Sequence, residues 1–251
     1  MILRKEFEID GHIISFLEIE NKFASNTFII LHGWGLSAFV YTELAKIIAK
    51  NNFRVIIIDL PGFGNSTSPR QLWGYEEFAK YISKLIATEV GDKVTLMGHS
   101  FGGGIAINIA SSYPSQIERL LLVDSSGIPI NLPLIRLGIN KLFEMIIQSI
   151  LKGGFFPSVK MCFSYLLNLI NNPIGLYRSL ELPIRHDLTN MLIKLKSPTK
   201  IYWAKKDLTI DIKIGEKMAG IINSPINHAP DFLYHDWCIT HPKIFVNSLN
   251  L

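Results

Sequence analysis

Ser100 stands in a setting typical of a nucleophilic serine. It is the central residue of Gly98-His99-Ser100-Phe101-Gly102, a G-x-S-x-G pattern. In an enzyme this pattern follows a strand and opens a helix, because the sharp turn between them exposes the serine hydroxyl above the sheet. The apolar run KVTLM precedes the pattern and FGGGIAINIA follows it, which favours a strand and then a helix. The sequence therefore predicts a nucleophile at Ser100, and a chance match is the alternative.

A serine nucleophile needs a base within hydrogen-bond reach and an acid that orients the base. In the fold where such a strand–turn–helix carries the serine, these groups follow later strands in the order acid, then histidine, and emerge at the same edge as the serine. Asp207 ends the run TKIYWAKKD, and His235 follows DFLY, which we interpret as a short strand within residues 226–234. We therefore expect Asp207 to be the acid and His235 the base.

Other side chains compete for these two roles. Asp59 and Asp124 also end predicted strands; Asp59 lies in a DLPGFG turn that it is expected to brace, which leaves Asp124 as the stronger rival for the acid. Four other histidines are poorer candidates for the base. His12 lies in the predicted hairpin and His186 in the helical segment, whereas His228 precedes the end of its predicted strand and His241 stands at a helix start.

Acyl transfer also requires two hydrogen-bond donors for the negative oxygen of the tetrahedral intermediate. One is the backbone N–H of the residue after the nucleophile, here Phe101, and the other comes from the loop after the third strand. That loop reads His32-Gly33-Trp34-Gly35, in which a glycine lets the backbone pass close to the site. We predict the Trp34 N–H as the second donor.

The elements that must position these residues alternate regularly. A hairpin is predicted around Asp10-Gly11. Apolar strands end in Gly, Ser or Asp, and helical stretches lie between them, which is typical of βαβ units in a doubly wound parallel sheet. The predicted strands after the hairpin are Thr27–Gly33, Arg54–Gly62, Lys93–Ser100, Arg119–Gly127, residues 199–207 and residues 226–234. The predicted helices are Ser37–Lys50, Tyr75–Thr88, Phe101–Tyr113, residues 212–222 and a short one after Pro242.

Residues 128–190 interrupt this alternation with helical patterning and several prolines. We predict an α/β core formed by residues 1–127 and 191–251, with a helical cap at 128–190 inserted after the sixth strand. The cap is rich in Leu, Ile, Phe and Met. Most of these side chains are expected to pack the cap onto the sheet, and a few candidates could line an acyl pocket: Phe143, Met145, Phe155 and Phe156.

The charge surplus is concentrated in the predicted cap. The 251-residue chain has a formal net charge of +4, too small to indicate a nucleic-acid partner. Six basic residues of the cap outnumber three acidic ones: Arg136, Lys141, Lys152, Lys160, Arg178 and Arg185 against Glu144, Glu181 and Asp187. We interpret the surplus as a solvated face, with docking of an acidic carrier protein as the alternative.

Composition limits the class of protein further. With 48% hydrophobic and 18% charged residues, the chain is not of the disordered type. Cys162 and Cys238 are far apart, which excludes a disulfide framework and indicates reduced thiols in the cytoplasm. The uncharged run Val94–Ile117 is long enough to span a bilayer, but its glycines favour a strand, a turn and a buried helix. We expect no metal, no organic cofactor and no membrane span.

Together these motifs resemble the α/β-hydrolase family across nearly the whole chain. The resemblance is carried by LHGWG, DLPGFGNS, GHSFGG, WAKKD and HDWCITHPKIF. The LHGWGL and DLPGFG segments are also similar to the pimeloyl-[acyl-carrier protein] methyl ester esterases. Three departures affect loop geometry: Ala204 replaces a frequent glycine, Thr209 and Ile210 stand where proline is often found, and Tyr234 replaces the glycine before the histidine.

The resemblance implies a serine hydrolase that cleaves a carboxylic ester with an apolar acyl part, either as a small molecule or on an acidic acyl-carrier protein. Hydrolysis of a carbon–carbon bond, perhydrolysis and acyl transfer to another acceptor remain open, because they use the same triad. A catalytically silent hydrolase fold that acts as a receptor or scaffold is the alternative outside enzymes. Oligomeric state is left open.

Overall fold

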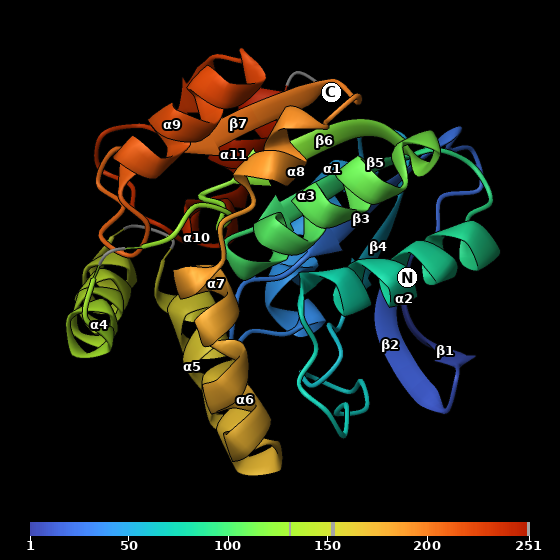
Figure 1. Ribbon diagram of the computed structural model, residues 1–251, viewed down its shortest axis with the longest axis horizontal. Coiled ribbons are helices and arrows are strands. Elements are labelled where there is room, and N and C mark those ends of the chain that lie inside the picture. Colours follow the sequence, from blue (N-terminus) through green and yellow to red (C-terminus); the bar gives the residue numbers. More distant parts are fainter. Residues whose placement is uncertain (131, 152–153, 250–251) are drawn as a thin grey trace.

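The computed structural model describes residues 1–130, 132–151 and 154–249, and a mixed sheet forms its centre (Figure 1). The sheet has eight strands in the order β1-β2-β4-β3-β5-β6-β7-β8. β1 (Ile2–Ile9) pairs antiparallel with β2 (His12–Ile19), and β2 pairs antiparallel with β4. The other neighbours are parallel. The predicted hairpin is confirmed, with Asp10 and Gly11 in the left-handed region at φ 50° and 76°.

The parallel strands, apart from the edge strand β8, are largely buried on both faces. They are β3 (Asn26–Leu31), β4 (Phe53–Ile58), β5 (Val94–His99), β6 (Ile117–Val123), β7 (Thr199–Trp203) and β8 (Ile226–His228). Side chains alternate between the two faces of a strand, so Ile29 and Leu31 enter one apolar cluster while Phe28 and Ile30 enter the other. This explains why these strands read as continuous apolar runs.

Helices cover both faces of the sheet, as the doubly wound prediction requires. One face packs against α1 (Thr42–Ala49), α10 (Trp237–Thr240) and α11 (Pro242–Leu249). The other packs against α2 (Tyr75–Glu89), α3 (Phe101–Ser112), α8 (Thr189–Ile193) and α9 (Ile212–Ile222). A 3₁₀ turn, Ala38–Tyr41, precedes α1, so this helix starts later than predicted.

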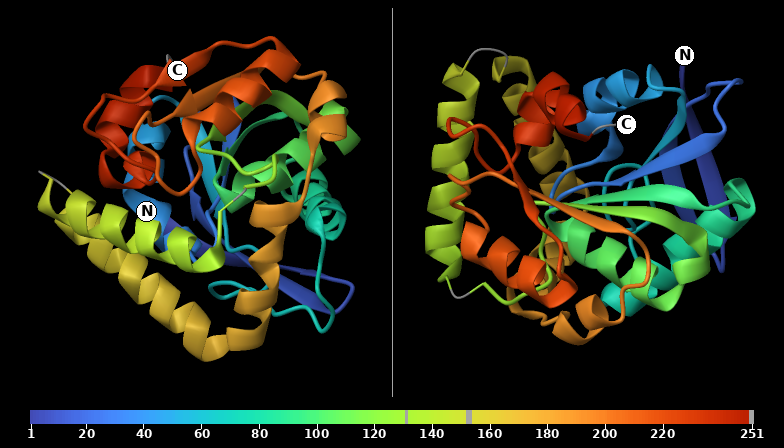
Figure 2. Two further views of the ribbon diagram at one scale, coloured as in Figure 1. Left: turned by 60° about the vertical axis from the view of Figure 1, so that its left-hand side comes forward. Right: turned by 90° about the horizontal axis from the view of Figure 1, so that it is seen from above.

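Four helices lie between β6 and the final part of the sheet domain: α4 (Leu134–Ile150), α5 (Phe155–Asn171), α6 (Pro173–Ser179) and α7 (Glu181–Arg185). Figure 2 shows the two long helices, α4 and α5, side by side at one end of the molecule. No strand occurs among the described residues of 128–190, in agreement with the sequence. We call this segment the insertion. Lys152, one of its predicted surface charges, lies outside the described residues.

Two sequence expectations are wrong. The last strand ends at His228 rather than near residue 234, because the chain turns at Pro230, whose carbonyl accepts from the Leu233 amide. His235 therefore follows a loop, not a strand. Most of the large apolar side chains of the insertion also fail to pack onto the sheet, although a minority such as Met161 and Leu182 are buried in the core. Phe143, Phe155 and Phe156 are exposed, and of the four pocket candidates only Met145 lines a cavity.

The uncharged run Val94–Ile117 folds as β5, the turn at Ser100, α3 and a 3₁₀ turn at Pro114–Gln116, as predicted. In the described part of the chain, no helix has the length and apolar character needed to cross a membrane.

Close contact between β3, β5 and α3 depends on glycine. A Cβ on Gly98 would lie 2.6 Å from Gly103 Cα, and a Cβ on Gly102 would lie 2.7 Å from the His32 carbonyl oxygen and closer still to that of Leu31. Real Cβ atoms do not approach this closely. These glycines therefore let the helix after Ser100 start directly against the sheet.

We expect Gly102→Ala to lower the free energy of unfolding by about 1–3 kcal/mol, because the methyl group meets backbone carbonyls that cannot move aside. Gly220→Ala in α9 is the matched control: its methyl group enters open space, so a gain of about 0.5–1 kcal/mol is expected from helix propensity. Urea unfolding midpoints measure the stability of both variants. Equal midpoints for the two variants would contradict the packing account.

Candidate active site

Ser100 occupies a strained turn between β5 and α3. Its backbone has φ 53° and ψ −119°, a conformation that non-glycine residues rarely adopt. The turn is held on both sides, because the Ser100 amide donates to the Val123 carbonyl at 3.0 Å and the Ser100 carbonyl accepts from the amides of Gly103 and Ser126. Ser100 is half-buried and lines a cavity. The predicted exposed turn is therefore present at this residue.

His235 and Asp207 form a buried pair. His235 Nδ1 lies 2.6 Å from Asp207 Oδ2, and the other carboxylate oxygen accepts from the amides of Thr209 and Ile210 at 2.8 and 2.7 Å. A proline at either position would remove one of these donors. Burial lowers the pKa of His235 to about 4, so the imidazole is neutral at pH 7. Burial also raises the pKa of Asp207, and the two backbone donors oppose that rise.

Asp124 lies near this pair and has other partners. Its Oδ1 accepts from the Ala204 amide at 2.8 Å, and its Oδ2 accepts from Trp237 Nε1 at 2.8 Å. Burial and the adjacent Asp207 carboxyl raise the pKa of Asp124, which favours its protonated form. The geometry thus ties Asp124 to the backbone at the end of β7 and to α10, whereas Asp207 holds the imidazole.

Asp59 braces its loop, as the sequence suggested. Its carboxylate accepts from the Ala38 amide at 2.7 Å and from the Asn65 amide at 3.2 Å, and it pairs with Arg4 at 2.7 Å. These bonds connect the DLPGFG turn to the 3₁₀ turn before α1 and to the hairpin.

The Trp34 amide lies on the loop after β3, and the Phe101 amide is the first of α3, directly after Ser100. In residues 1–130, 132–151 and 154–249, no protein acceptor is hydrogen-bonded to either amide. His32 fixes the orientation of the Trp34 amide. The Leu60 amide donates to His32 Nε2 at 3.0 Å, which assigns the ring proton to Nδ1, 2.8 Å from the Gly33 carbonyl oxygen. Because a trans peptide directs its C=O and N–H oppositely, holding the Gly33 carbonyl also sets the direction of the Trp34 N–H.

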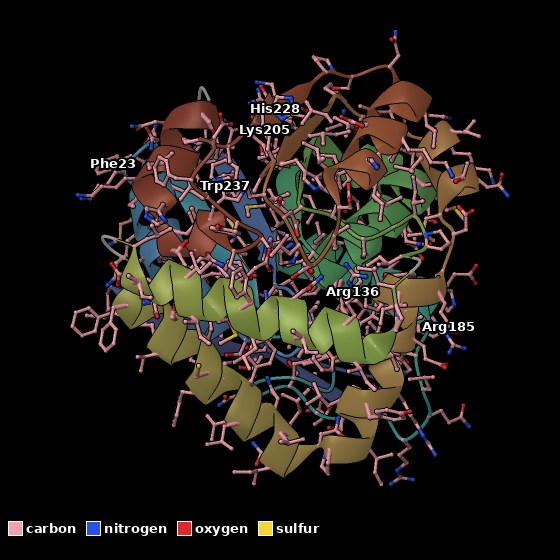
Figure 3. The ribbon with its side chains drawn as sticks, turned by 90° about the vertical axis from the view of Figure 1, so that its left-hand side faces the viewer. Phe23, Arg136, Arg185, Lys205, His228 and Trp237 are labelled. Atoms are coloured by element: carbon pink, nitrogen blue, oxygen red, sulfur yellow. The ribbon has the colours of Figure 1, made fainter. Side chains whose placement is uncertain are left out.

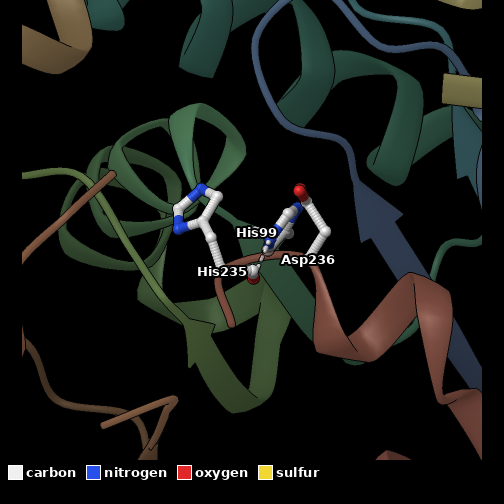
Figure 4. Close-up of side chains that lie close together, drawn as sticks. All are labelled: His99, His235 and Asp236. Carbon is white, nitrogen blue, oxygen red and sulfur yellow. Dashed lines mark hydrogen bonds between the residues drawn. The ribbon is translucent and has the colours of Figure 1, made fainter. Parts of the chain in front are cut away.

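A hydrogen-bonded chain connects the Gly33 loop to the His235 loop. The Gly33 amide donates to the Tyr41 hydroxyl at 3.0 Å, and that hydroxyl lies 2.6 Å from His99 Nδ1. His99 Nε2 in turn lies 3.2 Å from the His235 carbonyl oxygen, the bond drawn as a dashed line in Figure 4. This order assigns the His99 proton to Nε2. Burial lowers the pKa of His99 to about 3, so the ring stays neutral and serves as a fixed link.

The cavity beside Ser100 is mostly apolar and has a volume of about 360 Å³. Ser100 and His235 line it together with aliphatic residues of the insertion, among them Leu137, Met145 and Ile184. Lys141 and Asp236 also line it, but they form a 2.6 Å ion pair with each other. Although burial opposes the charge on Lys141, the Asp236 carboxylate raises its pKa. The cavity can thus hold an apolar group next to a hydroxyl and an imidazole.

Polar residues of α4 hold the loops that carry the two candidate catalytic partners. Glu144 accepts from the Leu208 amide at 2.7 Å and from the Thr209 hydroxyl at 2.6 Å, just after Asp207. Lys141 pairs with the residue after His235, and Gln148 accepts from Thr240 at 3.1 Å. Burial and the nearby Asp207 carboxyl raise the pKa of Glu144 to about 7. The insertion therefore contributes directly to the geometry around the cavity.

Two groups of side chains have the residue types of a metal site: His99, His235 and Asp236, and Asp124, Asp207 and His235. Figure 4 shows the first group. Its His99 nitrogens already bind Tyr41 and the His235 carbonyl, and the Lys141 cation contacts Asp236. In the second group, the carboxylate oxygens bind backbone amides, an indole and an imidazole. Most of the possible ligand atoms in both groups are therefore already used within the protein, with the buried Asp236 Oδ1 left without a hydrogen-bond partner among the described residues.

The structure brings together the five residues singled out by sequence: Ser100, Asp207, His235, Trp34 and Phe101. Sequence reasoning missed the residues that hold them, namely His32, Tyr41, His99, Lys141 and Glu144. The histidines of LHGWG and GHSFGG were visible signals, because a histidine inside a buried glycine turn needs partners for both ring nitrogens. Nothing in the local sequence pointed to Tyr41 or to the α4 contacts, since their partners are distant in the chain.

Tyr41→Phe should lower the free energy of unfolding by about 1–3 kcal/mol, because it leaves His99 Nδ1 and the Gly33 amide buried without a partner. Tyr202→Phe is the matched control. Tyr202 is equally buried, but its hydroxyl has no hydrogen-bond partner among the described residues, so its removal should be neutral or stabilising. Thermal unfolding compares the two. A similar loss in both variants would contradict the proposed link.

Comparison with known proteins agrees with this geometry. A family model described as alpha/beta hydrolase fold matches residues 26–176. A pimeloyl-[acyl-carrier protein] methyl ester esterase of Wigglesworthia glossinidia brevipalpis is 28% identical over 254 residues, covering 88% of this chain and 94% of that protein.

Solved structures share the fold at lower identity. A serine hydrolase involved in carbazole degradation aligns with a TM-score of 0.82 and 19% identity, covering 99% of this chain and 97% of the other. A bromoperoxidase from Bacillus anthracis aligns with a TM-score of 0.81 and 20% identity, covering 98% of each chain. Because the family model spans more than half of the sequence, this chain belongs to the alpha/beta hydrolase fold family.

Proposed function

We propose that this hydrolase is a serine esterase that cleaves carboxylic esters with an apolar acyl part. The observation that carries the proposal is the shared cavity: the strained Ser100 and the Asp207-paired His235 line one apolar space of about 360 Å³. An apolar pocket with a few convergent polar groups is the usual form of a small-molecule site. The insertion, residues 128–190, acts as a cap over this cavity.

The proposed reaction has two steps. His235 Nε2 takes the proton of the Ser100 hydroxyl as Oγ attacks the ester carbonyl carbon, and the N–H groups of Trp34 and Phe101 bind the oxyanion. The imidazolium then gives its proton to the departing alcohol, leaving an acyl-serine. Water, deprotonated by His235, attacks this acyl group, and the carboxylic acid and free Ser100 result. Asp207 holds the imidazole and stabilises its cation throughout.

Electrostatics of the site support these roles. His235 is neutral at pH 7 and so can accept a proton. Asp207 accepts three hydrogen bonds, which stabilise its carboxylate and oppose the effect of burial on its pKa. Losing one oxyanion donor typically lowers turnover about 10²–10³-fold, so the fixed direction of the Trp34 N–H contributes to the rate.

A second candidate is hydrolysis of pimeloyl-[acyl-carrier protein] methyl ester. It is favoured by the Wigglesworthia esterase, whose likeness extends over 88% of this chain. A cap with surplus positive charge suits an acidic carrier. Lys141 does not contribute to such a surface, because it is paired with Asp236 inside the cavity.

Purified protein should hydrolyse p-nitrophenyl esters, with kcat/KM rising about fourfold per added methylene until the acyl chain fills the cavity. Ser100→Ala and His235→Ala should each lower kcat about 10⁶-fold, with no further loss in the double variant. Ser112→Ala, at the far end of α3, is the matched control and should keep full activity. Turnover that persists in Ser100→Ala would overturn the assignment.

Asparagine variants decide between the two acids. Asp207→Asn should lower kcat about 10⁴-fold, because the amide favours the wrong imidazole tautomer. Asp124→Asn should keep kcat within about tenfold of the parent, because Asp124 accepts from the Ala204 amide and the Trp237 indole and not from the imidazole. Steady-state rates at pH 7 measure both. Full activity in Asp207→Asn together with loss in Asp124→Asn would move the acid to Asp124.

A further inference from the structure

Helices α4 and α5 turn polar side chains toward the protein and apolar side chains toward solvent, the opposite of the usual arrangement. In a water-soluble domain the apolar face of a helix faces the core. In α4 the buried positions include Glu144 and Gln148, and in α5 they include Ser158, Ser164 and Asn168. Most of these polar side chains bind the loops around the cavity, as Asn168 does with the carbonyls of Gly35 and Leu36.

Most of the large apolar side chains of both helices are exposed to solvent. On α4 the outward positions follow a spacing of three or four residues: Ile135, Ile139, Leu142 and Ile146. On α5 the same spacing gives Phe156, Val159, Phe163, Leu166 and Ile170. Among the described residues, fifteen of the twenty-four exposed large apolar side chains belong to these two helices. An apolar surface of this kind marks a contact with another body.

These two rows form one surface, which we call the outer face. α4 packs along α5 (Figure 2), and both helices turn polar side chains toward the loops around the cavity. Figure 3 views the molecule from this side, with α4 across the front and α5 beside it. The outer face therefore faces away from the sheet over the length of two 17-residue helices.

Cations outnumber carboxylates around the outer face. α4, α5 and α6 carry Arg136, Lys160 and Arg178 outside the cavity, and Figure 3 shows Arg136 on this side near the start of α4. Within described residues 134–180, the single acidic residue is Glu144, and it is buried. The described residues of α4, α5 and α6 thus combine an apolar centre with cations and offer no exposed carboxylate, although Glu43 of α1 lies near Lys160.

We propose that the outer face docks onto an anionic phospholipid surface. Apolar side chains and aromatic rings enter the boundary of the acyl region, and nearby lysines and arginines each contribute attraction to anionic headgroups. A second copy fits less well, because a two-fold contact would place Arg136, Lys160 and Arg178 against the same cations. The apolar arc of α5, which also includes Phe155, Leu167 and Leu169, is moreover wider than a two-helix seam.

The cavity adjoins the outer face. Leu134 and Leu142 of α4 both line the cavity and are exposed to solvent. A lipid-dissolved ester would therefore pass from the docked surface to Ser100 beside residues of the same helix. Docking itself does not rest on the esterase assignment, so it is tested in a Ser100→Ala background that carries no turnover.

The test is co-sedimentation of full-length Ser100→Ala protein with vesicles of phosphatidylcholine alone and with about one-third phosphatidylglycerol, a proportion that gives a negative surface potential. We expect binding to the mixed vesicles that weakens as salt is raised. Adding Ile146→Asp or Phe163→Asp should weaken binding about tenfold or more, because each puts a charge where an apolar side chain would enter lipid.

The matched control is Ile193→Asp on α8, an isoleucine of similar exposure away from the outer face, which should bind like the parent. Circular dichroism checks that all variants fold. Absence of binding to the mixed vesicles, or binding that Ile146→Asp leaves unchanged, overturns the proposal. A dimer that Ile146→Asp dissociates, without vesicle binding, assigns the outer face to a second copy. Salt-sensitive binding of an acyl-carrier protein, without vesicle binding, assigns it to that acidic partner.

Discussion

The left-handed backbone of Ser100 is the constraint on which the remaining structure depends. A serine at φ 53° is stable here because its amide and carbonyl are bonded to β6 and to the segment after it. The same turn demands glycine at 98 and 102, where any Cβ would meet backbone atoms. Strand β5, the turn and helix α3 therefore pack closely together. Ser100 is the first residue after the carboxyl end of β5, and it lines the cavity.

Neutral histidines hold the loops around that turn. His32 fixes the Gly33 carbonyl, and His99 joins Tyr41 to the His235 backbone. Burial lowers the pKa values of both rings to about 4 and about 3, so both stay neutral at pH 7 and act as fixed hydrogen-bonding links. On the opposite side, Glu144 and Lys141 of α4 brace the loops after Asp207 and His235. The insertion, whose residues line the cavity, also holds the loops around it, which explains why its inner side is polar.

Local sequence patterns were sufficient for most of the core. Periodic apolar runs located β1–β7 and α9, and Asp10-Gly11 located the hairpin. In these segments the secondary structure follows from residues that are close together in the sequence. The end of β8 was missed, since Pro230 terminates a run that otherwise reads as a strand. Tyr41 and Lys141 act on partners 58 and 95 residues away, beyond what spacing can reveal. The insertion was misjudged for a different reason: helical periodicity shows two faces but not which one meets the protein, and here the polar face does.

The central claim is that Ser100 is a nucleophile activated by His235. Labelling with a fluorophosphonate, followed by mass spectrometry of the intact protein and its peptides, tests it most directly. The account predicts one label per chain, on the peptide that contains Ser100, with labelling slowed by orders of magnitude in His235→Ala and absent in Ser100→Ala. A folded protein that takes no label, or takes it at another residue, would contradict the claim.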